Sequence, residues 1–119
     1  MPRPAHTLIA LNHVQADRAD DFEASLRTVV VPAVRQVRPD LDGLWRVLRA
    51  EEVDDGVVVF AFLIEGGTPE DWELEPVLEK ALGPQGAEDT LREFSAMLRK
   101  EQYGWSFRHV DFDGEFDGA

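Results

Sequence analysis

The sequence has 119 residues, 44% of them hydrophobic and 30% charged, which is typical of one globular domain that needs no disulfide or metal for its stability. It contains no cysteine and no apolar run of about 18 residues, so disulfides, thiol catalysis, cysteine metal sites and a transmembrane helix are excluded. The formal net charge of −12 argues against nucleic acid as a partner, because an acidic surface repels phosphate backbones. The N-terminal segment lacks the pattern of a secretory signal, and we expect a cytoplasmic protein.

The first third of the chain reads as a strand followed by a helix. Residues 7–14 are apolar and β-branched, which predicts the strand. From Asp17 to Val37, apolar residues recur every three or four positions, which predicts the helix. Pro32 interrupts this pattern, so we expect either a kink or two helical pieces with Pro32 in the first turn of the second. Pro39 is expected to end the helix.

A β-hairpin follows. Residues 44–52 and 57–65 are predicted as its two strands. Between them, Asp55-Gly56 is a pair typical of the two positive-φ positions of a tight hairpin turn.

The second strand of this hairpin is apolar at both odd and even positions, from Val57 to Ile64. A strand with one wet face should alternate, so we expect both of its faces to be covered. The helices of one chain can cover only one face of a four-stranded sheet. A second copy of the chain is the simplest cover for the other face, on which we place Trp45 and Trp105 as well. The alternative is that the long helical region folds over both faces.

The remainder of the chain is predicted as a helical region and a last strand. Thr68 as N-cap, Pro69 at the first helical position and Asp71 three residues after the cap indicate a helix start, with Trp72 in a short first turn. The later elements are predicted as a helical piece at 76–82, a break at Gly83–Gly86, a last helix at 87–101, a strand with alternating aromatic residues at 103–110, and an acidic tail at 111–119 that we expect to fray.

The order β-α-β-β-α-(α)-β is that of a ferredoxin-like α+β fold, with a four-stranded antiparallel sheet and an extra helix. We expect residues 1–119 to form a single domain, ordered from about residue 7 to residue 110.

This layout resembles the dimeric α+β barrel superfamily, and within it the branch of antibiotic biosynthesis monooxygenases and haem-degrading monooxygenases. The resemblance rests on residues 10–26, on a Pro-x-Leu-x-Gly segment before the second strand, and on an acidic pair followed by tryptophan. The matching positions are Asn12, Val14, Phe22 and Glu23, then Pro39, Leu41 and Gly43, then Glu70, Asp71 and Trp72.

The resemblance implies a homodimer in which two sheets form a barrel, with a pocket between each sheet and its helices. It also implies a cofactor-independent enzyme of the monooxygenase or cyclase type acting on a small aromatic or polyketide-like molecule, since the superfamily includes polyketide cyclases. Haem-degrading members carry a haem-ligating histidine after the matching tryptophan. Residues 75–91 contain no histidine, so we expect no haem. The residues imply no other cofactor and no metal, and we expect none. The alternative is a non-catalytic small-ligand-binding or dimerisation module of the same fold.

Asn12 is the first candidate for a catalytic residue. In the resembling monooxygenases an asparagine at this position hydrogen-bonds an oxygen of the substrate, and an amide can both donate and accept. The alternative is that Asn12 bonds nearby backbone at the strand end. Trp72 is the first candidate for substrate binding, because the resemblance places it in the pocket wall. It could equally be an apolar anchor of the helix start.

His13 and His109 are the other catalytic candidates. A histidine can carry a proton near neutral pH, and the two could approach each other if the first and last strands are neighbours. Exposure at a strand end is the alternative. Arginines within apolar strands can bind a carboxylate or enolate, or pair with an acid at the sheet edge. The remaining substrate-binding candidates are Trp45, Trp105, Arg46 and Arg108.

Overall fold

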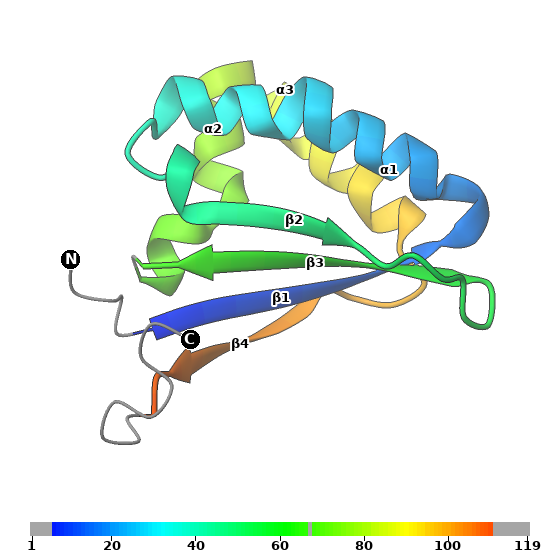
Figure 1. The fold of residues 1–119 in the computed structure, drawn as a ribbon. Coiled ribbons are helices and arrows are strands. Elements are labelled where there is room, and N and C mark those ends of the chain that lie inside the picture. The colour runs from blue at the N-terminus through cyan, green and yellow to red at the C-terminus, as the bar shows by residue number, and fades with distance from the viewer. Residues whose placement is uncertain (1–5, 67, 111–119) are drawn as a thin grey trace.

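The computed structural model describes residues 6–66 and 68–110. Its centre is a four-stranded antiparallel sheet with the strand order β2-β3-β1-β4 (Figure 1). This order and the sequence of elements confirm the predicted ferredoxin-like α+β fold. The strands are β1 (His6–Gln15), β2 (Trp45–Arg49), β3 (Val57–Glu65) and β4 (Tyr103–Arg108).

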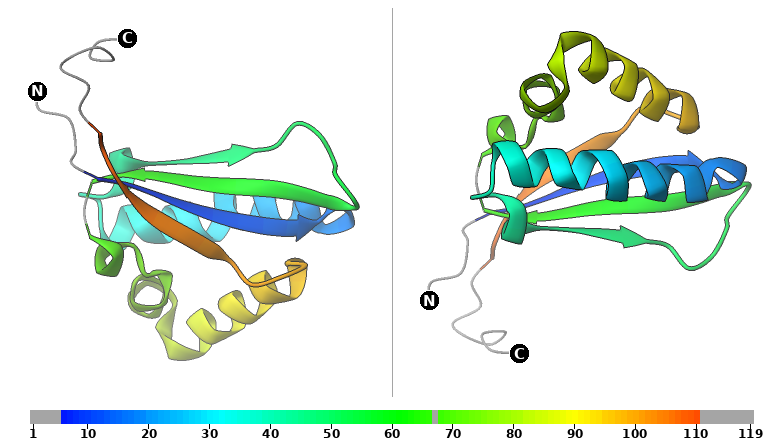
Figure 2. Two further views of the ribbon diagram at one scale, coloured as in Figure 1. Left: turned by 90° about the horizontal axis from the view of Figure 1, so that it is seen from below. Right: turned by 90° about the horizontal axis from the view of Figure 1, so that it is seen from above.

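All of the helices lie on one side of this sheet (Figures 1 and 2). The first helical region joins β1 to β2, and the second joins β3 to β4. In chain order the helical elements are η1 (Ala16–Arg18), α1 (Ala19–Ser25), the π-helical turn η2 (Leu26–Val30), α2 (Val31–Val37), η3 (Asp42–Leu44), η4 (Pro69–Trp72) and α3 (Leu74–Met97).

Pro32 lies in the first turn of α2, which is the second of the two predicted alternatives. Proline has no N–H, and its ring would clash with the carbonyl four residues before it in a regular helix. The wider π-helical turn η2 lies directly before α2 and relieves this clash, because its backbone hydrogen bonds join residues five positions apart and not four. The chain therefore continues in one direction from α1 to α2 despite the proline.

The hairpin between β2 and β3 has the predicted turn, with φ of 52° at Asp55 and 71° at Gly56. Strand β3 covers the predicted residues. The prediction that β2 runs over 44–52 is too long, since it spans only Trp45–Arg49. The next residue, Ala50, still donates to the carbonyl of Val59 at 2.9 Å. Beyond it the chain bends at Glu51 and Glu52, and the acidic end of the hairpin is exposed.

The predicted helix start at Thr68 is confirmed. The Thr68 amide donates to the Asp71 carboxylate at 3.0 Å, which forms the capping box of η4. Helix α3 then bends at Gly83, where φ is 82° and ψ is 166°, followed by Pro84. The predicted break at 83–86 is therefore confined to one residue, and only glycine adopts this conformation without strain.

The last helix ends at Met97, and the prediction that it runs to residue 101 is wrong. Leu98 is extended and forms a β-bridge with Val14, and the Arg99 amide donates to the His13 carbonyl at 2.7 Å. Pairing with the sheet thus ends the helix early. Strand β4 also ends two residues before its predicted end, and the tail 111–119 lies outside the described residues.

The core lies between the helices and one face of the sheet. On β1 and β3 the even-numbered side chains face the helices, and α1 adds Phe22, whose ring lies 4.9 Å from that of Phe60. The largest side chains that are fully buried are Phe22, Phe60, Leu78, Val14 and Val30.

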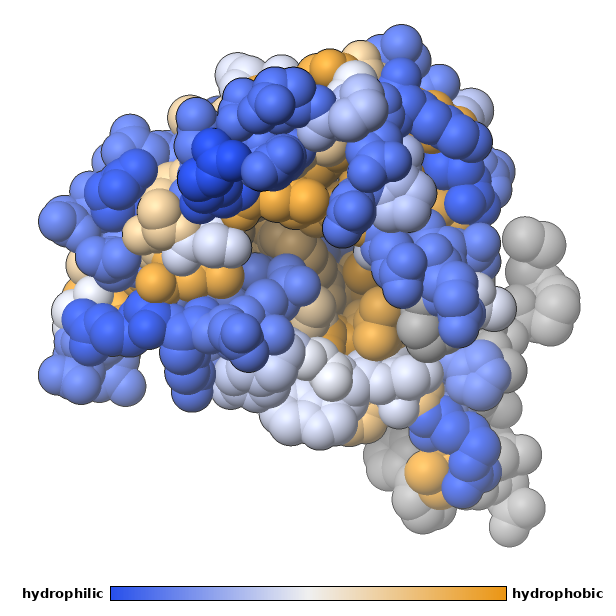
Figure 3. Space-filling model, turned by 180° about the vertical axis from the view of Figure 1, so that it is seen from behind, coloured by the Kyte–Doolittle hydropathy of each residue, from blue (hydrophilic) through white to orange (hydrophobic). Residues whose placement is uncertain are grey.

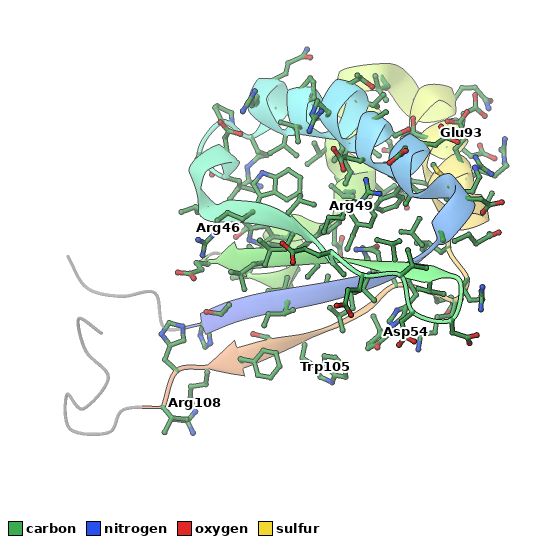
Figure 4. All side chains as sticks on the ribbon, turned by 45° about the vertical axis from the view of Figure 1, so that its right-hand side comes forward. Arg46, Arg49, Asp54, Glu93, Trp105 and Arg108 are labelled. Atoms are coloured by element: carbon green, nitrogen blue, oxygen red, sulfur yellow. The ribbon has the colours of Figure 1, made fainter. Side chains whose placement is uncertain are left out.

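No helix covers the opposite face of the sheet in the described part of the chain, so the alternative in which the helical region covers both faces is wrong (Figures 1 and 4). Trp105 projects on this side and is 53% exposed, and Phe107 and Leu48 are 47% and 51% exposed. We call this surface the open face. Its apolar side chains, by strand register, are Ile9, Leu11, Leu48, Val57, Val59, Ala61, Leu63, Tyr103, Trp105 and Phe107.

Candidate ligand-binding cleft

A cleft runs between α3 and the helix side of the sheet. It has a small inner part of about 140 Å³ and a larger outer part of about 630 Å³. The two parts adjoin, because Phe62, Leu74, Leu91 and Gln102 line both. Seen from the side opposite Figure 1, the molecule is hollowed between helices and sheet, with hydrophobic side chains inside and hydrophilic ones around them (Figure 3). The outer part has the size of small-molecule sites in proteins.

Aromatic side chains form one wall of the outer cleft. The Trp45 ring lies 5.8 Å from Phe62 and 6.4 Å from Trp72, between centroids. The indole Nε1 of Trp72 donates to the Gly66 carbonyl at 3.0 Å, which holds the ring in place. The expectation that Trp45 lies on the open face together with Trp105 is therefore wrong. Its partner in the register is Ile64, whose side chain faces the helices.

Asn12 lies at the base of the inner cleft, on β1, and is 2% exposed. Its Nδ2 donates to the Phe60 carbonyl at 3.2 Å, and its Oδ1 accepts from Gln102 Nε2 at 2.7 Å. Asn12 therefore makes both the backbone contact and a side-chain contact, and its amide is fixed in one orientation. A buried amide with both ends bonded is a rigid polar group in an otherwise apolar site.

Gln102 lines both parts of the cleft, although it is not among the site residues that the sequence predicts. It directly precedes β4, in which the alternating aromatic residues indicate a strand but give no information about Gln102. The pairing of β1 with β4 brings it to Asn12, which is 90 residues away in the sequence. No local pattern around Gln102 marks such a long-range contact.

Gly104 forms part of the cleft floor on β4. A Cβ atom at this position would lie 2.6 Å from the Ile9 carbonyl oxygen and 3.3 Å from the Ala10 Cβ. The two strands therefore approach more closely here than a side chain permits, which leaves this part of the floor open.

The charged side chains that line the outer cleft are Glu73 and Glu75, and both residues are exposed. Among the described residues, no lysine, arginine or histidine lines either part of the cleft. The cleft therefore offers carboxylates, amides and the Ser95 hydroxyl, and no positive charge, to a bound molecule.

The two histidines do not meet, although β1 and β4 are neighbours. His109 Nε2 lies 2.7 Å from Thr7 Oγ1 at the start of β1, whereas His13 lies near its end, about 20 Å along the strand. The expected approach of the two is therefore wrong. The His13 ring stacks on Tyr103 with centroids 5.5 Å apart, on the side of the sheet away from the cleft. Its Nδ1 is buried without a partner among the described residues. Burial, and to a smaller extent the charge of Lys100, lowers the pKa of His13 below its usual value.

The structure brings Trp45 and Trp72 to the outer part of the cleft, which adjoins the inner part that Asn12 lines, and places the other substrate-binding candidates elsewhere. Arg46 lies opposite Leu63 on the open face, and its Nη2 is 3.6 Å from Glu65 Oε1. Trp105 lies on the open face, and Arg108 is exposed at the far end of β4 (Figure 4).

Within residues 6–66 and 68–110, no three histidine, aspartate or glutamate side chains come together as a metal site would require. The helices of this part of the chain also include none with the length and apolar character needed to span a bilayer.

No protein-family model and no curated protein matches the sequence. Solved structures match the fold at low identity. A NIPSNAP family protein from Agrobacterium tumefaciens is 9% identical with a TM-score of 0.61, over 94% of this chain and 91% of that one. A candidate antibiotic biosynthesis monooxygenase from Nitrosomonas europaea is 14% identical with a TM-score of 0.53, over 92% and 94%. A monooxygenase from Streptomyces coelicolor, in complex with the ligand nanaomycin D, is 16% identical with a TM-score of 0.51, over 93% and 92%. At these identities the similarity shows the fold alone.

Proposed function

We propose that the cleft is the active site of a cofactor-independent enzyme, of the monooxygenase or cyclase type, that acts on a small aromatic or polyketide-like molecule. The observation that carries this proposal is the Asn12 amide, which is buried and oriented at the base of a cleft with aromatic walls. The fold that the chain shares with the Streptomyces coelicolor monooxygenase supports the choice of reaction class.

Oxygenation and cyclisation both pass through an enolate or phenolate, whose oxygen carries negative charge. Asn12 Nδ2 uses one N–H for the Phe60 carbonyl, and a primary amide has a second N–H to donate. In a water-poor site, a donor that is already oriented stabilises such charge more than water does, because it need not reorganise. Asn12 would thus polarise the reacting oxygen, while Trp45 and Trp72 hold the flat ring.

The proposed enzyme is a homodimer that is joined through the open face. Apolar side chains cover this face on all four strands, and the described helices cover none of it. A large exposed apolar sheet face is unusual on a soluble monomer. A second copy of the same sheet would bury it symmetrically.

A second candidate function is a non-catalytic module of the same fold that binds a small ligand. The observation that favours it is the lack of any histidine, lysine or arginine among the described residues that line the cleft. Without such a group, the ionisable side chains left to take the proton that the substrate must lose are Glu73 and Glu75, which are exposed in the outer part of the cleft.

Oxygen uptake and ligand binding measured together distinguish the two functions. We would add naphthols, and separately a linear β-polyketone, and follow oxygen with an electrode and products by mass spectrometry. An enzyme should convert one of these, and Asn12→Ala should lose most of the turnover. Gln15→Ala is the matched control, because Gln15 is an amide on the same strand whose side chain bonds Ala96 outside the cleft. Tight binding without conversion would support the binding module instead.

A further inference from the structure

The hydrogen bonds around Asn12 determine which atoms the cleft presents to a ligand. The Phe60 carbonyl can only accept, so the Asn12 nitrogen must face it, and Asn12 Oδ1 then faces Gln102. Since Oδ1 can only accept, Gln102 must contribute its Nε2, at 2.7 Å. Gln102 Oε1 accepts no hydrogen bond from the described residues. The polar floor of the cleft therefore presents a free acceptor, Gln102 Oε1, in addition to the second N–H of Asn12.

The charged residues that line the cleft disfavour an anionic ligand. Glu73 and Glu75 line the outer part, and no described lining residue is basic. A carboxylate or phosphate on a ligand would lose its hydration in the cleft without gaining a cationic partner, and would be repelled by these two carboxylates. A hydroxyl group, in contrast, can donate to an acceptor.

We infer that the cleft selects a planar aromatic molecule that carries a hydroxyl group and no negative charge, and that Gln102 recognises the hydroxyl by accepting its hydrogen bond at Oε1. This inference rests on the proposed function and goes beyond it by naming the chemical class of the ligand and the residue that selects it. The aromatic rings of Trp45, Trp72 and Phe62 supply the flat apolar surface against which the ligand lies.

Two ligands of nearly equal shape test the role of Gln102. β-Naphthol has a hydroxyl donor, and β-methoxynaphthalene has the same ring system without one. By isothermal titration calorimetry at pH 7, the naphthol should bind about fivefold more tightly to the unaltered protein, the effect of one neutral hydrogen bond. In Gln102→Met the two affinities should become equal, through a loss for the naphthol alone. Gln36→Met is the control, because Gln36 is an exposed amide on α2.

A variant that is less stable would weaken the binding of both ligands alike, so the ratio of the two affinities still tests the role of Gln102. Gln102→Ala provides a second variant. A naphthol preference that persists in both variants would show that Gln102 does not recognise the hydroxyl. An equal loss for both ligands would show that Gln102 only positions Asn12, which also overturns the inference.

The charge selection is tested with a hydroxynaphthoic acid, which adds one carboxylate to the naphthol. We expect it to bind at least about tenfold more weakly than β-naphthol at pH 7, and the double variant Glu73→Gln, Glu75→Gln should reduce the difference. Equal binding of the acid would overturn this part of the inference. If none of the ring compounds bound, the proposed function itself would fail. Binding of the ether and the acid as tight as that of the naphthol would overturn the inference and leave the proposed function standing.

Discussion

Arg38 Nη2 donates to Asp71 Oδ1 at 3.3 Å, and this ion pair joins the end of α2 to η4, the turn that carries Trp72. Arg38 also forms a two-point contact with Asp40, with donor–acceptor distances of 3.1 Å and 3.0 Å. The Trp72 side of the cleft is thus anchored to the first helical region through one arginine.

Because Asp71 is ionisable, this anchor should make the stability of the fold depend on pH. The Thr68 amide, more than the Arg38 guanidinium, holds the pKa of Asp71 below its usual 3.8. A carboxyl whose pKa is lowered by folding stabilises the protein above that usual value, and the contribution is lost as pH falls through the lowered pKa. Asp71→Asn should therefore reduce the melting temperature at pH 6, and the difference from the unaltered protein should shrink as pH falls below 3.8. A constant difference at all pH values would contradict this assignment.

The imidazole of His13 should titrate below 6.5, because burial first and Lys100 second disfavour its charged form. Folding then favours the neutral ring, so its contribution to stability is complete above 6.5 and is lost as pH falls through the lowered pKa. In an NMR titration, Lys100→Gln should raise the pKa of His13 only part of the way to 6.5. Lys80→Gln, the same change on α3, should leave it unchanged, and equal effects of the two variants would exclude a local cause.

The close approach at Gly104 should make this position intolerant of any side chain. Gly104→Ala places a Cβ 2.6 Å from the Ile9 carbonyl oxygen, and we expect a loss of about 1–3 kcal/mol in the free energy of unfolding, measured with urea. Gly43→Ala is the matched control, because a Cβ there has no heavy atom within 4 Å. It should change stability by no more than about 1 kcal/mol, in the stabilising direction. A neutral Gly104→Ala would mean that β1 and β4 separate readily.

The proposed dimer predicts a mass near twice 13.4 kDa in analytical ultracentrifugation. Phe107→Lys should shift the protein to monomer, because it buries an unpaired charge between two sheets. Val53→Lys should not, although Val53 is 61% exposed and Phe107 only 47%. Within one chain both substitutions are at exposed positions, so only a second copy on the open face explains a difference between them. A monomeric unaltered protein would disprove the dimer.

The elements that the sequence predicts well are those with local causes. Asp55 and Gly56 take the positive-φ turn that their side chains favour, and Thr68 begins a turn through its own neighbour Asp71. Strand β3 is apolar from Val57 to Ile64, and its bounds are those that this run predicts. The fold class follows from these elements and their order.

The predictions that fail depend on contacts between distant segments. Leu98 leaves the helix because Val14 is available to pair with it, and no helical pattern reveals a partner so far away in the chain. The face of Trp45 is predicted wrongly, because the register of β2 against β3 places Trp45 opposite Ile64 and no local pattern reveals that register. In the same way, the local motif is enough to make Asn12 a candidate, whereas Gln102 becomes a candidate only when β4 lies beside β1.

The bend at Gly83 makes the two walls of the cleft mechanically unequal. The sheet wall is tied by cross-strand hydrogen bonds along β1, β3 and β4. The opposite wall takes Leu74 from the arm of α3 before the bend, and Leu91 and Phe94 from the arm after it. A small rotation at one glycine changes the spacing of these side chains and leaves every strand in register. The width of the cleft can therefore adapt to ligands of different size, or diverge between related sequences, without any change to the hydrogen-bonded floor.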